Sequence, residues 1–97
     1  MDVQVDIEGS DATAVLRGSL NTNTAGDLEA ALAPIMGQAK SITFDFTELD
    51  YVSSAGLRVL MMAFKRLGGQ GVVIEHASDE IREVFDITGF SALFDIR

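Results

Sequence analysis

The chain alternates between short segments with the periodicity of a β-strand and longer segments with that of an α-helix, and this order constrains its fold more than any other feature. Apolar side chains occupy every second position in residues 3–7 and again in residues 42–46, which is typical of a half-buried strand. Residues 12–16 and 72–75 also have strand character, whereas residues 55–67 have the pattern of a strong helix. Strands separated by helices predict right-handed crossovers and a largely parallel sheet.

Turn residues mark the borders of the first segments. The cluster at residues 8–11, Glu-Gly-Ser-Asp, predicts a hairpin that joins the first two strands. A polar stretch over residues 18–24 leads into a first helix, with acidic residues in its first turns where the helix dipole favours anions. Pro34 should weaken or kink this helix, and Gly37 should stop it.

The second half of the chain completes the expected order. Residues 48–54 are expected to form a loop, Ser78 to cap a third helix and Gly89 to close it. Residues 90–94 predict one more helical turn at the sheet edge. The fold class is therefore α/β (α+β): a small mixed sheet of about four strands in the order β-β-α-β-α-β-α, with helices covering mainly one face. Residues 1–97 are expected to form a single domain.

Charge and composition exclude several classes of protein. Seven Lys and Arg residues against fifteen Asp and Glu give a net charge of −8, which argues against a nucleic-acid-binding surface. The chain has no cysteine, so disulfides and thiolate-based zinc sites or catalysis are excluded. It begins without the basic and apolar regions of a signal peptide, and no apolar run reaches the roughly 20 residues of a membrane span. We expect a cytoplasmic protein with no direct membrane insertion.

No motif in the chain predicts an active site. The only histidine, His76, follows a short strand, and the Gly-x-Ser-x-Gly turn of serine hydrolases is absent. No phosphate-binding loop of the Gly-x-x-x-x-Gly-Lys-Ser/Thr type is present. The nearest approach to a carboxylate cluster is Asp45, Glu48 and Asp50, for which a solvated loop is the simpler interpretation. The sequence therefore predicts a protein that is not an enzyme and that carries no metal or cofactor.

The most informative segment is the start of the helix at residues 55–67, which follows two serines. The ordinary interpretation is that one of them is the helix N-cap, whose oxygen accepts a backbone N–H. Gly56 is less usual, because glycine in a helix costs up to about 1 kcal/mol relative to alanine. It indicates a close approach, either by another surface or by the protein's own sheet.

The same helix has an apolar arc and a basic side. The apolar arc that should face the sheet consists of Leu57, Leu60, Met61, Phe64 and Leu67. Arg58, Met62, Lys65 and Arg66 fall on the opposite side. The helix carries a charge of +3 and the rest of the chain −11. Such a side is ordinarily just a solvated surface, but a methionine ringed by cations also suits the binding of a partner protein.

These segments resemble the STAS domain of bacterial anti-sigma-factor antagonists. Residues 49–60, Leu-Asp-Tyr-Val-Ser-Ser-Ala-Gly-Leu-Arg-Val-Leu, are similar to the signature of that family. Residues 16–21 are similar to its second strand, which usually closes with Gly-Glu-Leu-Asp, and residues 81–90 to its last helix and the following turn. The resemblance covers nearly the whole chain, and the combination is specific although each piece alone is weak.

The resemblance implies a binding module that is switched by phosphorylation. In that family the unphosphorylated domain binds a kinase-type anti-sigma factor and so releases a sigma factor. The same serine kinase phosphorylates the serine two positions before the signature glycine, and a metal-dependent serine phosphatase reverses this. That serine is Ser54 here. The residues implied to contact the partner are Asn21, Thr22, Ser53, Ser54, Gly56, Arg58 and Met62.

Two positions depart from the commonest family pattern. Ser53 and Asn21 stand where the family often has aspartate, so both departures remove a negative charge beside Ser54, and Ser53 is itself an alternative acceptor. The resemblance also implies a second hypothesis, that of a STAS-domain subunit regulating an ABC-type lipid transporter ATPase without phosphorylation, because single STAS-like domains similar to this chain have that role. A third, a small serine hydrolase, lacks the other residues of a catalytic triad.

Overall fold

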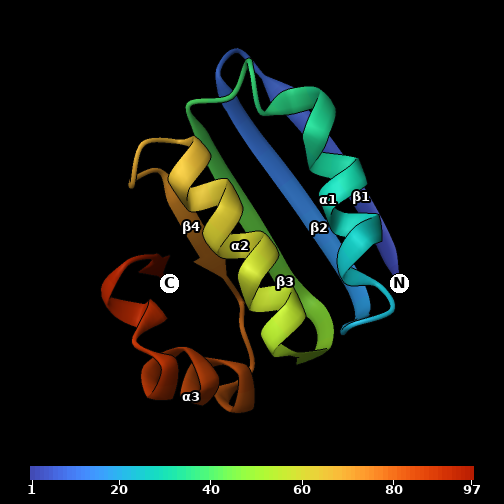
Figure 1. Ribbon diagram of the computed structural model, residues 1–97, viewed down its shortest axis with the longest axis vertical. Helices are drawn as coiled ribbons and strands as arrows, with labels where there is room; N and C mark the ends of the chain where they lie inside the picture. The colour runs from blue at the N-terminus through green and yellow to red at the C-terminus, as the bar shows by residue number, and fades with distance from the viewer.

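The computed structural model describes residues 1–97 as one mixed sheet with three helices (Figure 1). The elements in chain order are β1 Asp2–Glu8, β2 Asp11–Leu20, α1 Ala25–Leu32, β3 Ser41–Val52, α2 Ser54–Arg66, β4 Val72–Glu75, α3 Asp79–Thr88 and β5 Asp95–Ile96. The predicted order and the mixed sheet are confirmed, with one more strand than expected. β5 has only two residues, too few to leave a periodic pattern in the sequence.

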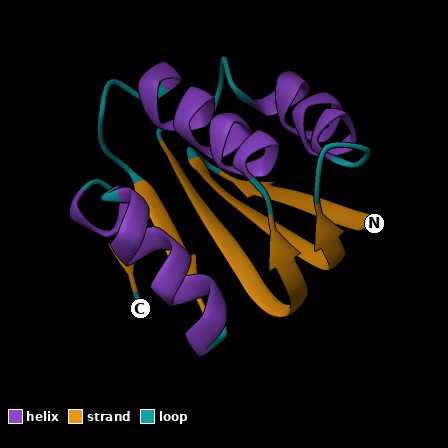
Figure 2. Ribbon diagram, turned by 60° about the horizontal axis from the view of Figure 1, so that its bottom comes forward, coloured by secondary structure: helices purple, strands orange, loops and turns teal.

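The order of the strands explains why one face of the sheet stays open. The strands lie in the order β1-β2-β3-β4-β5, with β1 antiparallel to β2 and every later pair parallel. Because successive right-handed crossovers that always advance in the same direction fall on the same side of a sheet, the helices gather over one face. Figure 2 shows α1 and α2 lying over that face of the sheet.

The core lies between this face and the helices. The predicted alternation of Ile42, Phe44 and Phe46 places all three side chains inside, each at most 1% exposed. The Phe46 ring stacks on Phe85 of α3 at a centroid distance of 6.3 Å, and Phe85 meets Phe94 edge to face at 6.0 Å. This aromatic chain fixes α3 to the same face of the sheet as α1 and α2.

The expected loop at residues 48–54 is wrong, because β3 continues through Val52. Val15 pairs with Asp45 and Arg17 with Glu48, so one residue of β2 lies opposite two residues of β3 between these pairs, and a second shift follows between Gly18 and Ser19. Each shift is a β-bulge, an extra residue in one strand. The bulges replace the period of two by a pattern in which one residue in three is buried, so the sequence does not have the pattern of a strand there.

The boundaries of the first helix and of the second strand also differ from expectation. α1 ends at Leu32, and Pro34 is the second residue of a short 3₁₀ turn over Ala33–Ile35, which is the weakening expected of a proline at this position. β2 runs on to Leu20, four residues beyond the predicted strand. The caps of α3 are confirmed: the Ser78 hydroxyl accepts from the Ile81 N–H at 3.2 Å, and Gly89 adopts a φ of 81°.

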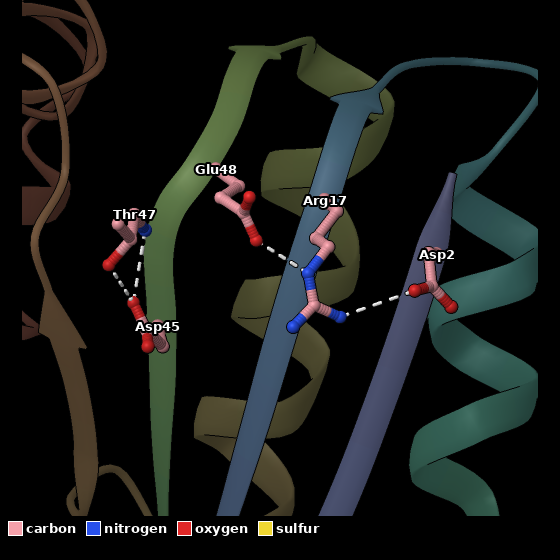
Figure 3. A network of polar contacts seen from close by, with 5 residues as sticks. All are labelled: Asp2, Arg17, Asp45, Thr47 and Glu48. Carbon is pink, nitrogen blue, oxygen red and sulfur yellow. Dashed lines mark hydrogen bonds and ion pairs between the residues drawn. The ribbon is translucent and has the colours of Figure 1, made fainter.

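The open face of the sheet is polar and mostly acidic. Arg17 lies between two carboxylates there, with its Nε donating to Glu48 and a terminal nitrogen 3.2 Å from Asp2 (Figure 3). The hydrogen bond and the charge of Glu48, helped by Asp2, raise the pKa of the Arg17 guanidinium above its ordinary value. Figure 3 shows the helices behind the strands that carry this network, so it lies on the face opposite the helices.

Candidate functional site

The site lies at the carboxyl ends of β2 and β3, where α1 and α2 begin. The Ser53 N–H donates to the Leu20 carbonyl at 2.8 Å, which ties the two strand ends together. The loop that follows β2 therefore lies beside the first turn of α2. In parallel sheets, binding and catalytic residues usually lie at the carboxyl ends of the strands, because the loops there are held by rigid strands.

The two serines at the start of α2 have different surroundings. Ser53 is the N-cap: its hydroxyl oxygen accepts from the Gly56 N–H at 3.3 Å, and its side chain is half-buried. Ser54 is the first residue of α2, its side chain is exposed, and its hydroxyl makes no hydrogen bond within the protein. Of the two hydroxyls considered as phosphate acceptors, the one on Ser54 is therefore free and accessible.

Position 56 has no room for a side chain, because Leu20 of the protein's own sheet lies against it. A Cβ atom at this position would lie 2.5 Å from Cγ and 2.9 Å from Cδ2 of Leu20, which is itself fully buried. A real Cβ essentially never comes so close to a neighbour. Gly56 allows the start of α2 to pack closely on the end of β2. Because it is buried, it contributes to the shape of the site and has little surface with which to contact a partner.

The loop after β2 is held by its own side chains. The Asn21 Oδ1 atom accepts from the backbone N–H groups of Asn23 and Thr24, at 2.9 and 3.1 Å. The Thr24 hydroxyl donates to the Ser19 carbonyl at 2.7 Å. An aspartate at position 21 would offer the same acceptor oxygen, so asparagine keeps the shape of the loop and removes only its charge. Thr22 is exposed between these contacts.

A hollow of about 390 Å³ lies between α1 and α2 next to this loop. It brings together Thr22, Arg58 and Met62, three residues that the sequence predicts at the binding surface. Met62 is half-buried here instead of fully exposed, because α1 packs beside α2. The same packing buries Val59 and Ala63, which the helical wheel leaves out of the apolar arc.

The predicted apolar arc of α2 faces the interior, but its five residues are buried to different degrees. Leu57 and Leu60 are buried against the sheet, whereas Met61, Phe64 and Leu67 are half-buried at its flank. Phe64 meets the Phe94 ring at a centroid distance of 5.5 Å. The two-layer arrangement covers one flank of α2 with α1 and leaves the other flank partly open.

The basic side of α2 has no acidic partner within the protein. Arg58, Lys65 and Arg66 are exposed, and the ion pairs of the chain involve Arg17 and Arg97 alone. Lys65 and Arg66 fall in the last turn of α2, where the helix dipole favours cations, but Arg58 lies in its second turn.

Two features of the surface are not predicted from the sequence. Tyr51 is 54% exposed near the end of β3, three residues before Ser54, because the second bulge directs it away from the core. Glu29 of α1 lines the hollow together with Arg58. The exposure of Tyr51 could have been suspected from the sequence, because an aromatic residue is unusual in a segment expected to be a polar loop. The position of Glu29 beside the hollow depends on how two helices pack, which the sequence does not show.

Two further kinds of feature bear on function: clusters of metal-ligating side chains and membrane-spanning helices. No group of three or more His, Asp or Glu side chains lies close enough together to hold a metal ion. No helix of the chain is both long and apolar enough to cross a bilayer.

Comparison with known proteins gives a consistent set of relatives. The family model described as "Mlab, STAS domain" matches residues 3–95. BtrV of Bordetella bronchiseptica, provisionally named an anti-sigma factor antagonist, is 40% identical over 86 residues, which cover 86% of this chain and 74% of BtrV. The anti-sigma-B factor antagonist of Bacillus subtilis is 28% identical over 100 residues, covering 99% of this chain and 92% of that protein.

Solved structures of similar fold include SpoIIAA, described as an anti-sigma factor antagonist. Its unphosphorylated form matches with a TM-score of 0.85 at 17% identity, over 99% of this chain and 88% of SpoIIAA. The phosphorylated form, from Bacillus, matches with a TM-score of 0.77 at 17% identity, over 99% of this chain and 91% of that chain. At this level of identity the match shows a common fold.

Proposed function

The chain belongs to the STAS domain family, and from this we propose that it is an anti-sigma-factor antagonist, a binding protein and not an enzyme, switched off by phosphorylation of Ser54. The names of two relatives, from Bordetella bronchiseptica and Bacillus subtilis, support the general role. The partner we propose is a kinase-type anti-sigma factor, bound by the unphosphorylated protein with release of a sigma factor. A metal-dependent serine phosphatase would restore the binding form.

One observation carries the proposal: a free, exposed serine hydroxyl at the first residue of a 13-residue helix. A kinase can reach this hydroxyl without disturbing the N-cap, because the capping oxygen belongs to Ser53. The same position would hold a phosphate at a helix N-terminus, where unpaired N–H groups and the helix dipole favour an anion. Phosphorylation is therefore compatible with the fold.

Arg58 is placed to meet that phosphate. It follows Ser54 by four residues on the same side of α2 and has no ion pair within the protein. A charge-assisted hydrogen bond from its guanidinium would satisfy part of the new charge. It would also remove Arg58 from the surface offered to the partner.

The effect of the switch therefore falls on the interface. A phosphate adds about −1.5 to −2 charges at the point where a partner would pack against the loop after β2 and the start of α2. Burying a charge that lacks a partner costs on the order of 3–5 kcal/mol, and each ~1.4 kcal/mol is a tenfold change in affinity. This is ample for an on/off switch.

The test is phosphorylation by the kinase-type anti-sigma factor encoded nearest to the gene for this chain. After incubation with ATP, mass spectrometry should locate one phosphate on Ser54, and the Ser54→Ala protein should stay unmodified. The Ser54→Ala protein should still bind the kinase, and Ser54→Asp should bind it far more weakly. A phosphate that persists in Ser54→Ala but disappears in Ser53→Ala would refute the assignment of the acceptor.

A second candidate function is the regulation of an ABC-type lipid transporter ATPase through the same surface, without phosphorylation. Ser53 and Asn21 favour it, since they replace the acidic residues that stand beside the acceptor serine in the commonest family pattern. The neighbouring genes separate the two candidates: a kinase and a sigma factor favour the first, an ATPase and a permease the second. Binding of the purified ATPase that is indifferent to Ser54→Asp would support the second.

A further inference from the structure

A groove runs along the outer surface between α1 and α2 and extends well beyond Ser54. The hollow beside the loop after β2 continues into a smaller one of about 80 Å³, and the two share Met62 and Glu29. We call this the α1–α2 groove; its walls are formed chiefly by Gly26, Glu29 and Met36 on the first side and by Arg58, Met62 and Arg66 on the second. Figure 1 shows the two helices lying side by side over the sheet.

The walls of the groove combine an apolar floor with a basic rim. Met62 lies in the middle, and it also borders a further hollow toward Lys65 on the outer side of α2. From Arg58 to Arg66 the rim spans about two helical turns, ~12 Å along the axis. The rim consists of Arg58 and Arg66 together with Lys65, which lines only the outer hollow. None of these three cations has an ion pair within the protein, and Glu29 is the only acidic group that lines the three hollows.

We propose that the α1–α2 groove receives an acidic amphipathic helix of the partner protein, with an apolar side chain seated on Met62 and carboxylates paired with Arg58, Lys65 and Arg66. The identity of that partner rests on the proposed function; the chemistry of its docking segment rests on the groove. A helix fits because anchors three, four and seven residues apart match a groove two turns long. Methionine on the floor adapts to side chains of different shape.

The distribution of charge over the molecule determines where an acidic helix can bind. α2 carries +3 and the remainder of the chain −11, and the open face of the sheet holds Asp2, Asp6 and Asp11 without a helix to cover them. An acidic helix is repelled from that face and attracted to the groove, so electrostatics selects one docking orientation. The contribution should fall with added salt, because the rim is exposed.

The first experiment uses a defined probe. A synthetic helical peptide of about 14 residues, ~21 Å long, with leucines on one face and glutamates elsewhere, is titrated into the chain carrying methyl-labelled methionine. Met36 and Met62 should shift, whereas Met1, which lines none of these hollows, should not. A peptide with lysine in place of glutamate should leave all signals unchanged. Equal shifts with both peptides, or shifts confined to Met1, would overturn the proposal.

Matched charge reversals separate the groove from net charge. K65E/R66E and K40E/R82E each change the net charge from −8 to −12, but Lys40 and Arg82 lie outside the groove and are equally exposed. We expect K65E/R66E to weaken binding of the glutamate peptide by about tenfold or more and K40E/R82E to change it by less than about threefold. Equal losses in the two variants would reduce the effect to long-range charge and overturn the groove.

The second experiment distinguishes failure of this inference from failure of the proposed function. Binding of the kinase-type anti-sigma factor is measured for the unmodified chain, Ser54→Asp, K65E/R66E and K40E/R82E, at about 0.05 and 0.3 M salt. Loss in Ser54→Asp with no loss in K65E/R66E would keep the proposed function and overturn the groove. No binding by the unmodified chain would refute the proposed function, and the peptide titration would still decide the groove. Binding of phosphatidylglycerol vesicles in preference to the glutamate peptide would assign the rim to a lipid surface and overturn the proposal.

Discussion

At the residue scale, the hydroxyls of Ser53 and Ser54 at the start of α2 differ in their hydrogen bonding. Ser53 satisfies one of the backbone N–H groups that every helix leaves unpaired at its beginning, whereas Ser54 has no such bond. The sequence alone leaves the two equivalent, because either can act as an N-cap and the difference depends on which residue has extended backbone angles. The structure assigns those angles to Ser53, with φ −99° and ψ 174°.

This difference predicts unequal effects of two alanine substitutions on stability. Ser53→Ala should lower the free energy of unfolding by about 1 kcal/mol through loss of the N-cap. Ser54→Ala should change it by less than about 0.5 kcal/mol, since an exposed hydroxyl without a partner is lost. Urea unfolding of the two variants beside the unmodified chain measures both values. A larger loss in Ser54→Ala would show that the cap has been assigned to the wrong residue.

Gly56 gives a second prediction at this scale. Alanine favours a helix by up to about 1 kcal/mol over glycine, but at this position its Cβ would collide with Leu20, so we expect Gly56→Ala to destabilise by about 1–3 kcal/mol. Gly26→Ala in α1 is the matched control, because a Cβ there meets no atom within 4 Å, and it should stabilise.

Thermal and urea unfolding decide the sign for each glycine. If Leu20 causes the loss, combining Gly56→Ala with Leu20→Ala should cost less than the sum of the two single changes. Additive losses in this double-mutant cycle would mean that the collision with Leu20 does not explain why position 56 is glycine.

At the scale of elements, the sequence predicts regular segments well and interrupted ones poorly. The alternation in residues 42–46 identifies the buried half of β3, because nothing disturbs its period. The far half of the same strand escapes, since two bulges shift the alternation and leave Tyr51 exposed beside Asp50. Bulges depend on the partner strand, which a single stretch of sequence does not reveal.

The first bulge is held by Asp45. Its Oδ1 atom accepts from the hydroxyl and from the N–H of Thr47, the latter at 3.0 Å (Figure 3). These two bonds lower the pKa of the Asp45 carboxyl below its ordinary value. A carboxyl whose pKa is lowered by folding stabilises the folded state above its unfolded pKa of about 3.9, and this contribution is lost as the pH falls through the folded pKa.

We therefore predict a pH-dependent cost for Asp45→Asn. At pH 7 the variant should be less stable than the unmodified chain, because asparagine keeps an acceptor oxygen but not its charge. At a pH below the lowered pKa of Asp45 the difference should shrink, since the carboxyl is then protonated in the folded state as well. Urea unfolding at both pH values measures it, and Asp50→Asn, at an exposed carboxylate outside the hydrogen-bond network, is the control. A difference that stays constant with pH would contradict the role of the charge.

At the scale of the whole molecule, topology and charge divide the protein into two faces. All crossovers advance in one direction, so the helices and the basic side of α2 lie on one face and the acidic strands are left open on the other. The sequence predicts the charge of each element and a sheet covered mainly on one face. It does not predict the α1–α2 groove, because the approach of Glu29 to Arg58 depends on how two helices pack over the same strands.

The open face should therefore limit the stability of the whole molecule through repulsion among its acids. Glu8 and Asp11 lie directly opposite each other in the β1–β2 pair, and like charges in that position are destabilising. Glu8→Lys should raise the free energy of unfolding at pH 7 by about 0.2–1 kcal/mol, and more at low salt than at about 0.2 M, where screening already relieves the repulsion. Asp50→Lys, at an exposed position of β3 that has no residue directly opposite in the sheet, changes the net charge equally without this pairing and should gain less. Equal gains in the two variants, measured by urea unfolding, would attribute the effect to net charge and not to the cross-strand pair.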